Sequence, residues 1–193
     1  MPNELPRVLL LGDSIRLSYQ PLVAERLAGR ACVVGPAENC QFSLHTLTRL
    51  DAWLEELGAP AVVHWNNGLH DIGRNETRNP VQYSLEQYLG NLGGILARLR
   101  AAGARTVIWA TTTPVHPTLP VPHKPWSWTN ADIAHYNAAA RQLMQAEGVP
   151  VNDLHAVVWQ DWERHLCEDR IHLSPAGQTA CAEAVADMVL RYL

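Results

Sequence analysis

The chain has 193 residues, a length typical of one compact domain, and we expect residues 1–193 to form a single domain. Fifteen Lys and Arg against nineteen Asp and Glu give a net charge of −4 without long runs of one sign, which argues against a nucleic-acid partner. No apolar stretch approaches the roughly 20 residues that span a bilayer, and no signal peptide is visible. These features predict a cytoplasmic protein without a membrane partner.

Five short apolar segments alternate with longer segments of helical periodicity. The segments expected to form strands are 7–11, 31–34, 61–65, 106–110 and 149–151. Their apolar character is continuous rather than alternating, which is typical of parallel strands buried on both faces. The alternation indicates βαβ units and therefore an α/β protein with a parallel sheet of about five strands.

Helix starts are marked by capping residues. Ser84 and Gln87 form a capping-box pattern, and two further helices are expected to begin after Thr129 and after Ser174. Another apolar stripe is typical of a helix face and consists of Leu44, Leu47, Leu50 and Leu54. We expect these apolar faces to form the core.

Residues 113–129 contain five prolines and are expected to form a long loop, since proline interrupts helices and strands. Trp126 and Trp128 lie in this loop beside His123 and Lys124. Their rings either form a wall of a substrate site or pack the loop onto the body of the protein. The other tryptophans expected in or near the core are Trp53, Trp109, Trp159 and Trp162.

Two polar clusters could carry chemistry. Ser14 follows the first predicted strand, at the end where open α/β sheets bind ligands, although Gly12 and Asp13 also suit a plain strand-to-helix turn. Asp169 and His172 lie three residues apart before the last helix and could form a surface ion pair, or orient the imidazole toward a nucleophile. A histidine with a reference pKa of about 6.5 can accept a serine proton near neutral pH. Together, the clusters predict a Ser-His-Asp triad.

The Gly12-Asp13-Ser14 and Asp169-x-x-His172 blocks resemble the first and last blocks of the SGNH hydrolases, also called GDSL esterases. The resemblance covers nearly the whole chain. It implies a flavodoxin-like, three-layer α/β/α sandwich and a serine esterase without metal or cofactor. Ser14 would be the nucleophile, His172 the base and Asp169 the residue that orients it. A small-molecule or carbohydrate ester, such as an acetyl ester, would be the substrate.

The middle blocks differ from the family pattern. The family supplies an asparagine side chain to the oxyanion hole from Gly-x-Asn-Asp after the third strand, where this chain has Gly68-Leu-His-Asp. Either His70 donates a ring N–H instead, or Asn67 reaches the same place; the register favours His70. Such a donor stabilises the transition state by roughly 2.7–4 kcal/mol.

In the second block, which usually supplies a glycine N–H, the glycine is absent from its expected later position. A backbone N–H near Asn39 or Cys40 is the candidate donor, because every residue except proline carries one. Asp13, Trp126 and Trp128 are the candidate substrate-binding residues.

Two other functions stay open. The block from Gly68 to Asp71 resembles one of the binuclear metallophosphoesterases, and the candidate metal ligands are His64, His70, His116, His123 and Asp71. That family also needs Asp-x-His near its N-terminus, and no acidic residue before Asp51 is followed by histidine two residues later. The altered oxyanion blocks could alternatively mark a catalytically disabled binding protein of the same fold.

Overall fold

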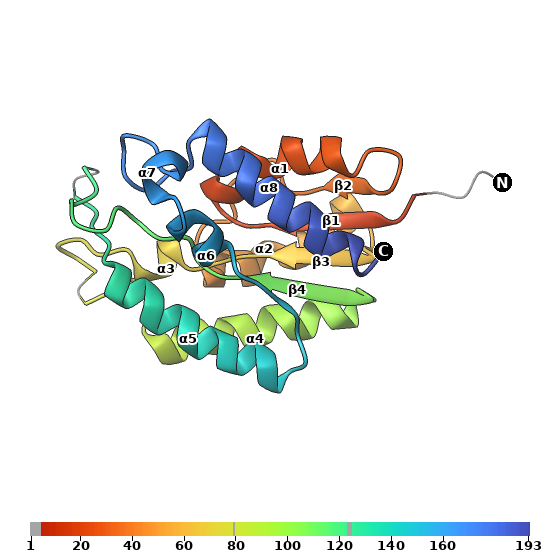
Figure 1. The fold of residues 1–193 in the computed structure, drawn as a ribbon. Helices are drawn as coiled ribbons and strands as arrows, with labels where there is room; N and C mark the ends of the chain where they lie inside the picture. Colours follow the sequence, from red (N-terminus) through yellow and green to blue (C-terminus); the bar gives the residue numbers. More distant parts are fainter. Residues whose placement is uncertain (1–4, 79, 123–124) are drawn as a thin grey trace.

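The computed structural model describes residues 5–78, 80–122 and 125–193. Its centre is a parallel sheet with the strand order β2-β1-β3-β4-β5 (Figure 1). The strands are β1 (Arg7–Leu11), β2 (Cys32–Val34), β3 (Val62–Trp65), β4 (Thr106–Ala110) and β5 (Val151–Asn152). Because the central strands are buried on both faces, their continuous apolar sequences fit this arrangement.

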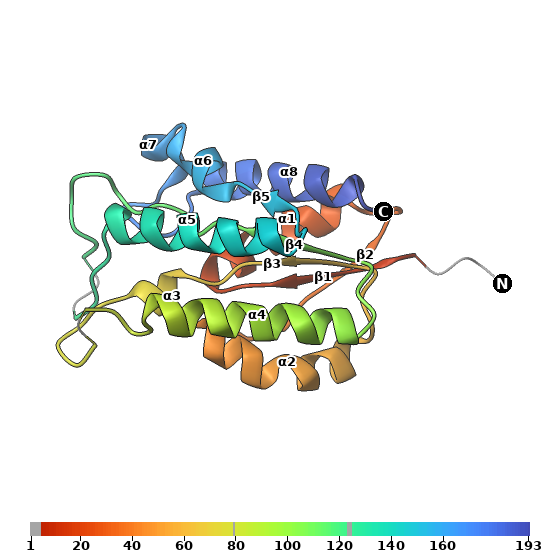
Figure 2. The same ribbon diagram turned by 90° about the horizontal axis from the view of Figure 1, so that it is seen from below.

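Helices cover both faces of the sheet, which confirms the predicted three-layer α/β/α architecture (Figure 2). One face carries α1 (Ser14–Arg26), α6 (Leu154–Trp159), α7 (Trp162–His165) and α8 (Pro175–Leu190). The other carries α2 (Ser43–Leu57), α4 (Leu85–Ala101) and α5 (Asn130–Ala146). The short helix α3 (Leu69–Ile72) follows β3. No helix in the described part of the chain is long and apolar enough to cross a membrane.

The predicted helix starts are confirmed. Ser84 and Gln87 form a complete capping box at α4, Thr129 accepts a hydrogen bond from the Asp132 N–H at α5, and Ser174 caps α8. These side chains satisfy N–H groups that have no partner within the helix. The starts could be predicted because each cap depends on residues three positions apart or closer.

Several details predicted from the sequence are wrong. Leu44 is 38% exposed, because α2 turns its Ser43, Thr46, Leu50 and Trp53 face toward the interior instead. Trp159 is 43% exposed rather than in the core. The last strand begins at Val151 instead of residue 149, since Pro150 has no N–H to donate to the sheet. Strands β2 and β3 each begin one residue later than expected.

The strand order places a crevice between β1 and β3. After β1 the chain crosses to the edge strand β2 and returns to β3 on the other side of β1, with α1 and α2 on opposite faces of the sheet. Open α/β sheets bind ligands where the strand order reverses, at the carboxyl ends of the strands. Here α1 begins at Ser14, directly after β1, and α3 follows β3.

Candidate active site

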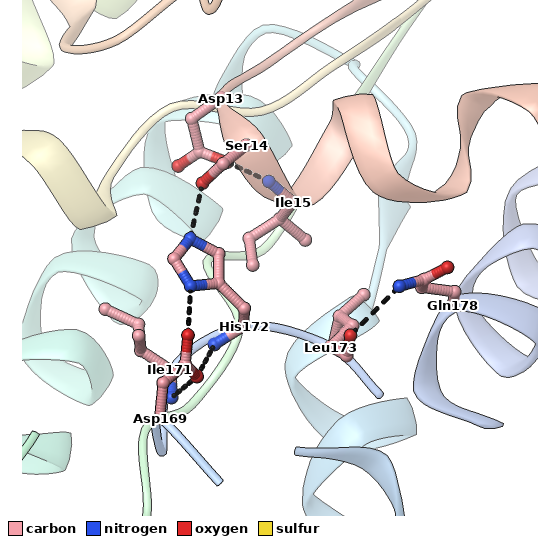
Figure 3. A network of polar contacts seen from close by, with 8 residues as sticks. All are labelled: Asp13, Ser14, Ile15, Asp169, Ile171, His172, Leu173 and Gln178. Carbon is pink, nitrogen blue, oxygen red and sulfur yellow. Dashed lines mark hydrogen bonds and ion pairs between the residues drawn. The ribbon is translucent and has the colours of Figure 1, made fainter. Parts of the chain in front are cut away.

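Ser14, His172 and Asp169 form a continuous hydrogen-bonded chain (Figure 3). The Ser14 Oγ lies 3.0 Å from His172 Nε2, and His172 Nδ1 lies 2.6 Å from Asp169 Oδ2. Residues from opposite ends of the sequence meet because α1 and α8 pack side by side, and their N-terminal ends lie at the same edge of the sheet. The arrangement matches a nucleophile, a base and a group that orients the base.

The loop around Asp169 fixes both the charge and the direction of the histidine. Asp169 Oδ1 accepts the N–H groups of Ile171 and His172 at 3.2 and 3.0 Å. Burial alone would raise the pKa of Asp169, but the hydrogen bonds from His172 and Ile171 outweigh it and lower the pKa to about 2. An ionised carboxylate only accepts hydrogen bonds, so the proton of His172 belongs on Nδ1 and Nε2 is left to accept from Ser14.

Asp13 has a structural task at the same turn. Its Oδ1 accepts the Ile15 N–H at 2.9 Å and caps α1, and the residue is 1% exposed. The turn geometry expected for Gly12-Asp13-Ser14 and the contact between Ser14 and His172 therefore occur together. Asp13 borders the cavity described below; its Oδ1 caps α1, whereas its Oδ2 is buried and has no hydrogen-bond partner among the described residues.

A cavity of about 420 Å³ opens over Ser14. It is lined by Asp13, Ser14, Asn39, Leu69, His70, Trp126, Trp128, Ile171 and His172. The structure thus brings residues of all four sequence blocks and of the proline-rich loop to one place. A cavity of this size admits a small ester.

Asn67 and Cys40 do not fit the donor roles considered for them. Asn67 is fully buried, and its side-chain amide donates to the Gln41 carbonyl and to Thr46 Oγ1, both at 3.0 Å, which uses both amide hydrogens. The Cys40 N–H donates to the Gly12 carbonyl at 3.1 Å. Neither residue lines the cavity. The candidate oxyanion donors that remain are His70 and Asn39.

His70 lies on α3, between two anchored neighbours. The Leu69 carbonyl accepts a hydrogen bond from Trp128 Nε1 at 2.7 Å, and the Asp71 carboxylate accepts both the N–H and the hydroxyl of Ser43. Gly68 allows the start of α3 to lie close to Thr112, which follows the end of β4, because a Cβ at position 68 would overlap Thr112 Oγ1. The backbone of His70 is therefore held firmly while its ring borders the cavity.

Asp71 is fully buried, and burial raises its pKa to about 7 despite the hydrogen bonds from Ser43. An unfolded Asp loses its proton near pH 3.9, whereas the folded protein holds this proton up to about pH 7. We therefore expect the contribution of Asp71 to the free energy of unfolding to be greatest below about pH 4. This contribution should decrease as the pH rises toward 7. The free energy of unfolding, measured with urea from pH 4 to 8, should decrease with pH in the wild type and decrease less in Asp71→Asn. An equal decrease in both proteins would contradict a raised pKa of Asp71.

Trp126 and Trp128 line the cavity and also pack the loop. Their rings are stacked with centroids 6.3 Å apart, and the Arg78 guanidinium lies 5.0 Å from the Trp126 centroid. Trp128 is tied to α3 through the Leu69 carbonyl. These contacts show that the pair packs the loop, and a substrate-binding role for the two rings stays a prediction. His123 and Lys124, which the sequence places beside them, lie outside the described residues.

The residues considered for a metal site are dispersed. His64 is buried within the sheet, its Nε2 lies 3.1 Å from Asn152 Nδ2, and burial lowers its pKa to about 3. Asp71 is engaged with Ser43 and His116 borders a separate cavity, while His123 lies outside the described residues. Within the described ranges, no group of three or more His, Cys, Asp or Glu side chains is arranged to hold a metal ion.

Arg16 is a buried arginine two residues after Ser14, and its role was not predicted from the sequence. It shares the inward face of α1 with Tyr19 and Val23. The spacing of three and four residues between them was the available signal, since a charged side chain on an otherwise buried helix face must find polar partners.

The fold and the Ser-His-Asp geometry are those of a three-layer α/β/α hydrolase. Residues 10–180 match the GDSL-like lipase/acylhydrolase family, and the chain belongs to this family. The family predicted from the sequence blocks is thereby confirmed, and the protein is a carboxylic ester hydrolase. No curated protein matches the chain in sequence.

Solved structures share the fold at low sequence identity. An acetyl xylan esterase, AlAXEase, has a TM-score of 0.77 at 18% identity, covering 95% of this chain and 99% of its own. A lipase/acylhydrolase from Enterococcus faecalis has a TM-score of 0.77 at 20% identity, with 96% and 95% covered. A carbohydrate esterase family 3 protein from Talaromyces cellulolyticus has a TM-score of 0.74 at 20% identity, with 97% of both chains covered.

Proposed function

We propose that the protein hydrolyses a carboxylic ester through an acyl-Ser14 intermediate. The observation that carries this proposal is the hydrogen-bonded chain from Ser14 through His172 to Asp169 at the edge of an open cavity. As Ser14 Oγ attacks the ester carbonyl carbon, His172 Nε2 accepts the serine proton and then delivers it to the departing alcohol. A water molecule, deprotonated by His172, then attacks the acyl carbon and releases the acid and free Ser14. The proposed steps use groups of the protein and water.

The negative oxygen of the tetrahedral intermediate needs hydrogen-bond donors. The Ser14 N–H lies in the first turn of α1, where N–H groups have no partner within the helix. His70 borders the same cavity. We propose that these two groups contribute to the oxyanion hole, with the His70 ring in the place of the family's asparagine.

Reaction with a fluorophosphonate tests the proposed nucleophile. The reagent phosphonylates an activated serine, so mass spectrometry should find one adduct, on Ser14, in protein that also hydrolyses p-nitrophenyl acetate. The absence of both labelling and hydrolysis in folded protein would overturn the proposal and favour a catalytically disabled binding protein.

His70→Ala should lower kcat for p-nitrophenyl acetate by about 10²–10³-fold, because one oxyanion donor is lost. Thermal unfolding should be nearly unchanged, since the ring makes no hydrogen bond to another described residue. His135→Ala, which changes an exposed histidine on α5, is the matched control and should retain wild-type kcat. An unchanged kcat in His70→Ala would remove His70 from the oxyanion hole.

We further propose that the substrate is an acetyl ester on a carbohydrate. The half-buried, stacked rings of Trp126 and Trp128 offer a flat apolar surface beside Ser14, of the kind on which sugar rings stack. Two of the structural neighbours described above are named as an acetyl xylan esterase and a carbohydrate esterase. These names support the proposed substrate class.

Trp126→Ala tests this substrate class better than a change at Trp128, whose indole also anchors α3. We expect KM for an acetylated xylo-oligosaccharide to rise by about tenfold, the equivalent of roughly 1.4 kcal/mol, while kinetics with p-nitrophenyl acetate stay nearly constant. Trp159→Ala removes an exposed tryptophan away from the cavity and serves as control. Equal effects of Trp126→Ala on both substrates would contradict a sugar-stacking role.

A further inference from the structure

The loop between β2 and α2 borders the cavity at Asn39. The residues on either side of Asn39 are fixed to the body of the protein. The Cys40 N–H donates to the Gly12 carbonyl at 3.1 Å, and the Cys40 carbonyl accepts from Thr46 Oγ1 at 3.0 Å. On the other side, the Glu38 carboxylate accepts from Trp53 Nε1 at 2.8 Å. A loop held in this way can present a side chain to the cavity in a defined direction.

Arg16 attaches the same loop at two further carbonyl groups. Its guanidinium is buried and donates to the Pro36 carbonyl at 2.8 Å, to the Glu38 carbonyl at 2.9 Å and to the Gly12 carbonyl at 3.3 Å. No carboxylate of the described residues lies within ion-pair distance of it. The planar guanidinium group therefore connects the loop to the turn that carries Ser14. This connection depends on the arrangement of the N–H donors of arginine and not on an ion pair.

The side chain of Asn39 is itself oriented by the loop. Its Oδ1 accepts the Gln41 N–H at 2.7 Å, an arrangement that local asparagine turns use. Gln41 has φ 52°, in the left-handed region that non-glycine residues seldom adopt, and its carbonyl accepts from Asn67. Because the oxygen end of the Asn39 amide is engaged, the NH₂ end is the part that remains for a ligand. It forms no hydrogen bond to another described residue.

We propose that the Asn39 side-chain amide donates a hydrogen bond to the acyl oxygen during attack by Ser14, and that Arg16 is the positioning residue that holds Asn39 in place. The inference rests on the proposed esterase function and assigns the second-block donor to a side chain. A carboxamide N–H stabilises the developing oxyanion only if it is oriented in advance, which the contacts from Gln41 and Arg16 provide.

Two substitutions at Asn39 separate donation from loop structure. Asn39→Asp keeps an oxygen for the Gln41 N–H but removes the donor, whereas Asn39→Ala removes the donor without adding charge. We expect both to lower kcat for p-nitrophenyl acetate by about 10²–10³-fold with little change in KM. Asn75→Asp is the matched control, because Asn75 Oδ1 accepts the Thr77 N–H in the same local turn outside the cavity. Wild-type kcat in Asn39→Ala would overturn the proposal, since any loss in Asn39→Asp would then come from the carboxylate charge.

Arg16→Lys tests the positioning role while keeping the positive charge. An ammonium cannot reproduce the planar fork, so we expect kcat to fall with KM nearly unchanged at a temperature where the variant is fully folded by circular dichroism. A lower melting temperature combined with wild-type kcat would show that Arg16 serves stability alone. If the Lys variant does not fold, Arg16→Gln is measured by the same criteria.

Fluorophosphonate labelling of the wild type distinguishes failure of the Asn39 role from failure of the proposed esterase function. Wild-type labelling and turnover together with wild-type kcat in both Asn39 variants would overturn only the role of Asn39. Absence of labelling and turnover in the wild type would overturn the proposed function and this inference with it.

Discussion

Ser14→Ala is expected to abolish ester hydrolysis, with a loss in kcat of about 10⁶-fold, the size seen when a triad nucleophile is removed. The Oγ is the atom that would form the acyl bond, and it lies 3.0 Å from His172 Nε2, the atom proposed to accept its proton. The fold should persist, because α1 is capped by Asp13 and not by Ser14. The measurements are p-nitrophenyl acetate turnover and thermal unfolding.

Two companion variants sharpen this test. Ser18→Ala removes a hydroxyl of the same helix that donates to the Ile15 carbonyl at 2.7 Å, and it should retain activity. The double variant Ser14→Ala with His172→Ala should be no slower than Ser14→Ala, since residues of a triad act as a unit. Turnover retained by Ser14→Ala, or a further large loss in the double variant, would be incompatible with an acyl-Ser14 intermediate.

Asp169→Asn should lower kcat by about 10⁴-fold while preserving the loop. The asparagine oxygen can still accept the N–H groups of Ile171 and His172. Its NH₂ group would face His172 Nδ1, however, and would favour the tautomer that carries the proton on Nε2. That nitrogen then cannot accept the proton of Ser14.

The effect should appear in both turnover and the rate of fluorophosphonate labelling, because both require an activated Ser14. Asp187→Asn, at an exposed position on α8, makes the same chemical change without contact with the site and should behave as wild type. Near-normal turnover in Asp169→Asn would mean that the carboxylate does not orient the base.

The class of fold and the three residues of the proposed triad could be predicted from the amino-acid sequence. Parallel strands buried on both faces need continuous apolar segments, and helix starts such as Ser84 need a cap and its partner within three residues. Ser14 and His172 could be found because each lies in a short block of recognisable local pattern. The rules that govern βαβ connections narrow the possible strand orders, and the structure gives the order β2-β1-β3-β4-β5.

Which of the neighbouring polar groups face the cavity depends on contacts that form only in the folded protein. Asn67 and His70 are three residues apart, but the two differ in the folded protein. The side-chain amide of Asn67 donates to Gln41 and Thr46, whereas His70 borders the cavity. Likewise, the N–H of Cys40 donates to the carbonyl of Gly12, which is distant in the sequence, whereas Asn39 borders the cavity. The cause is that a polar group is available to a ligand only if other groups of the protein do not already occupy its hydrogen bonds. Those partners come from distant parts of the chain that meet only after folding.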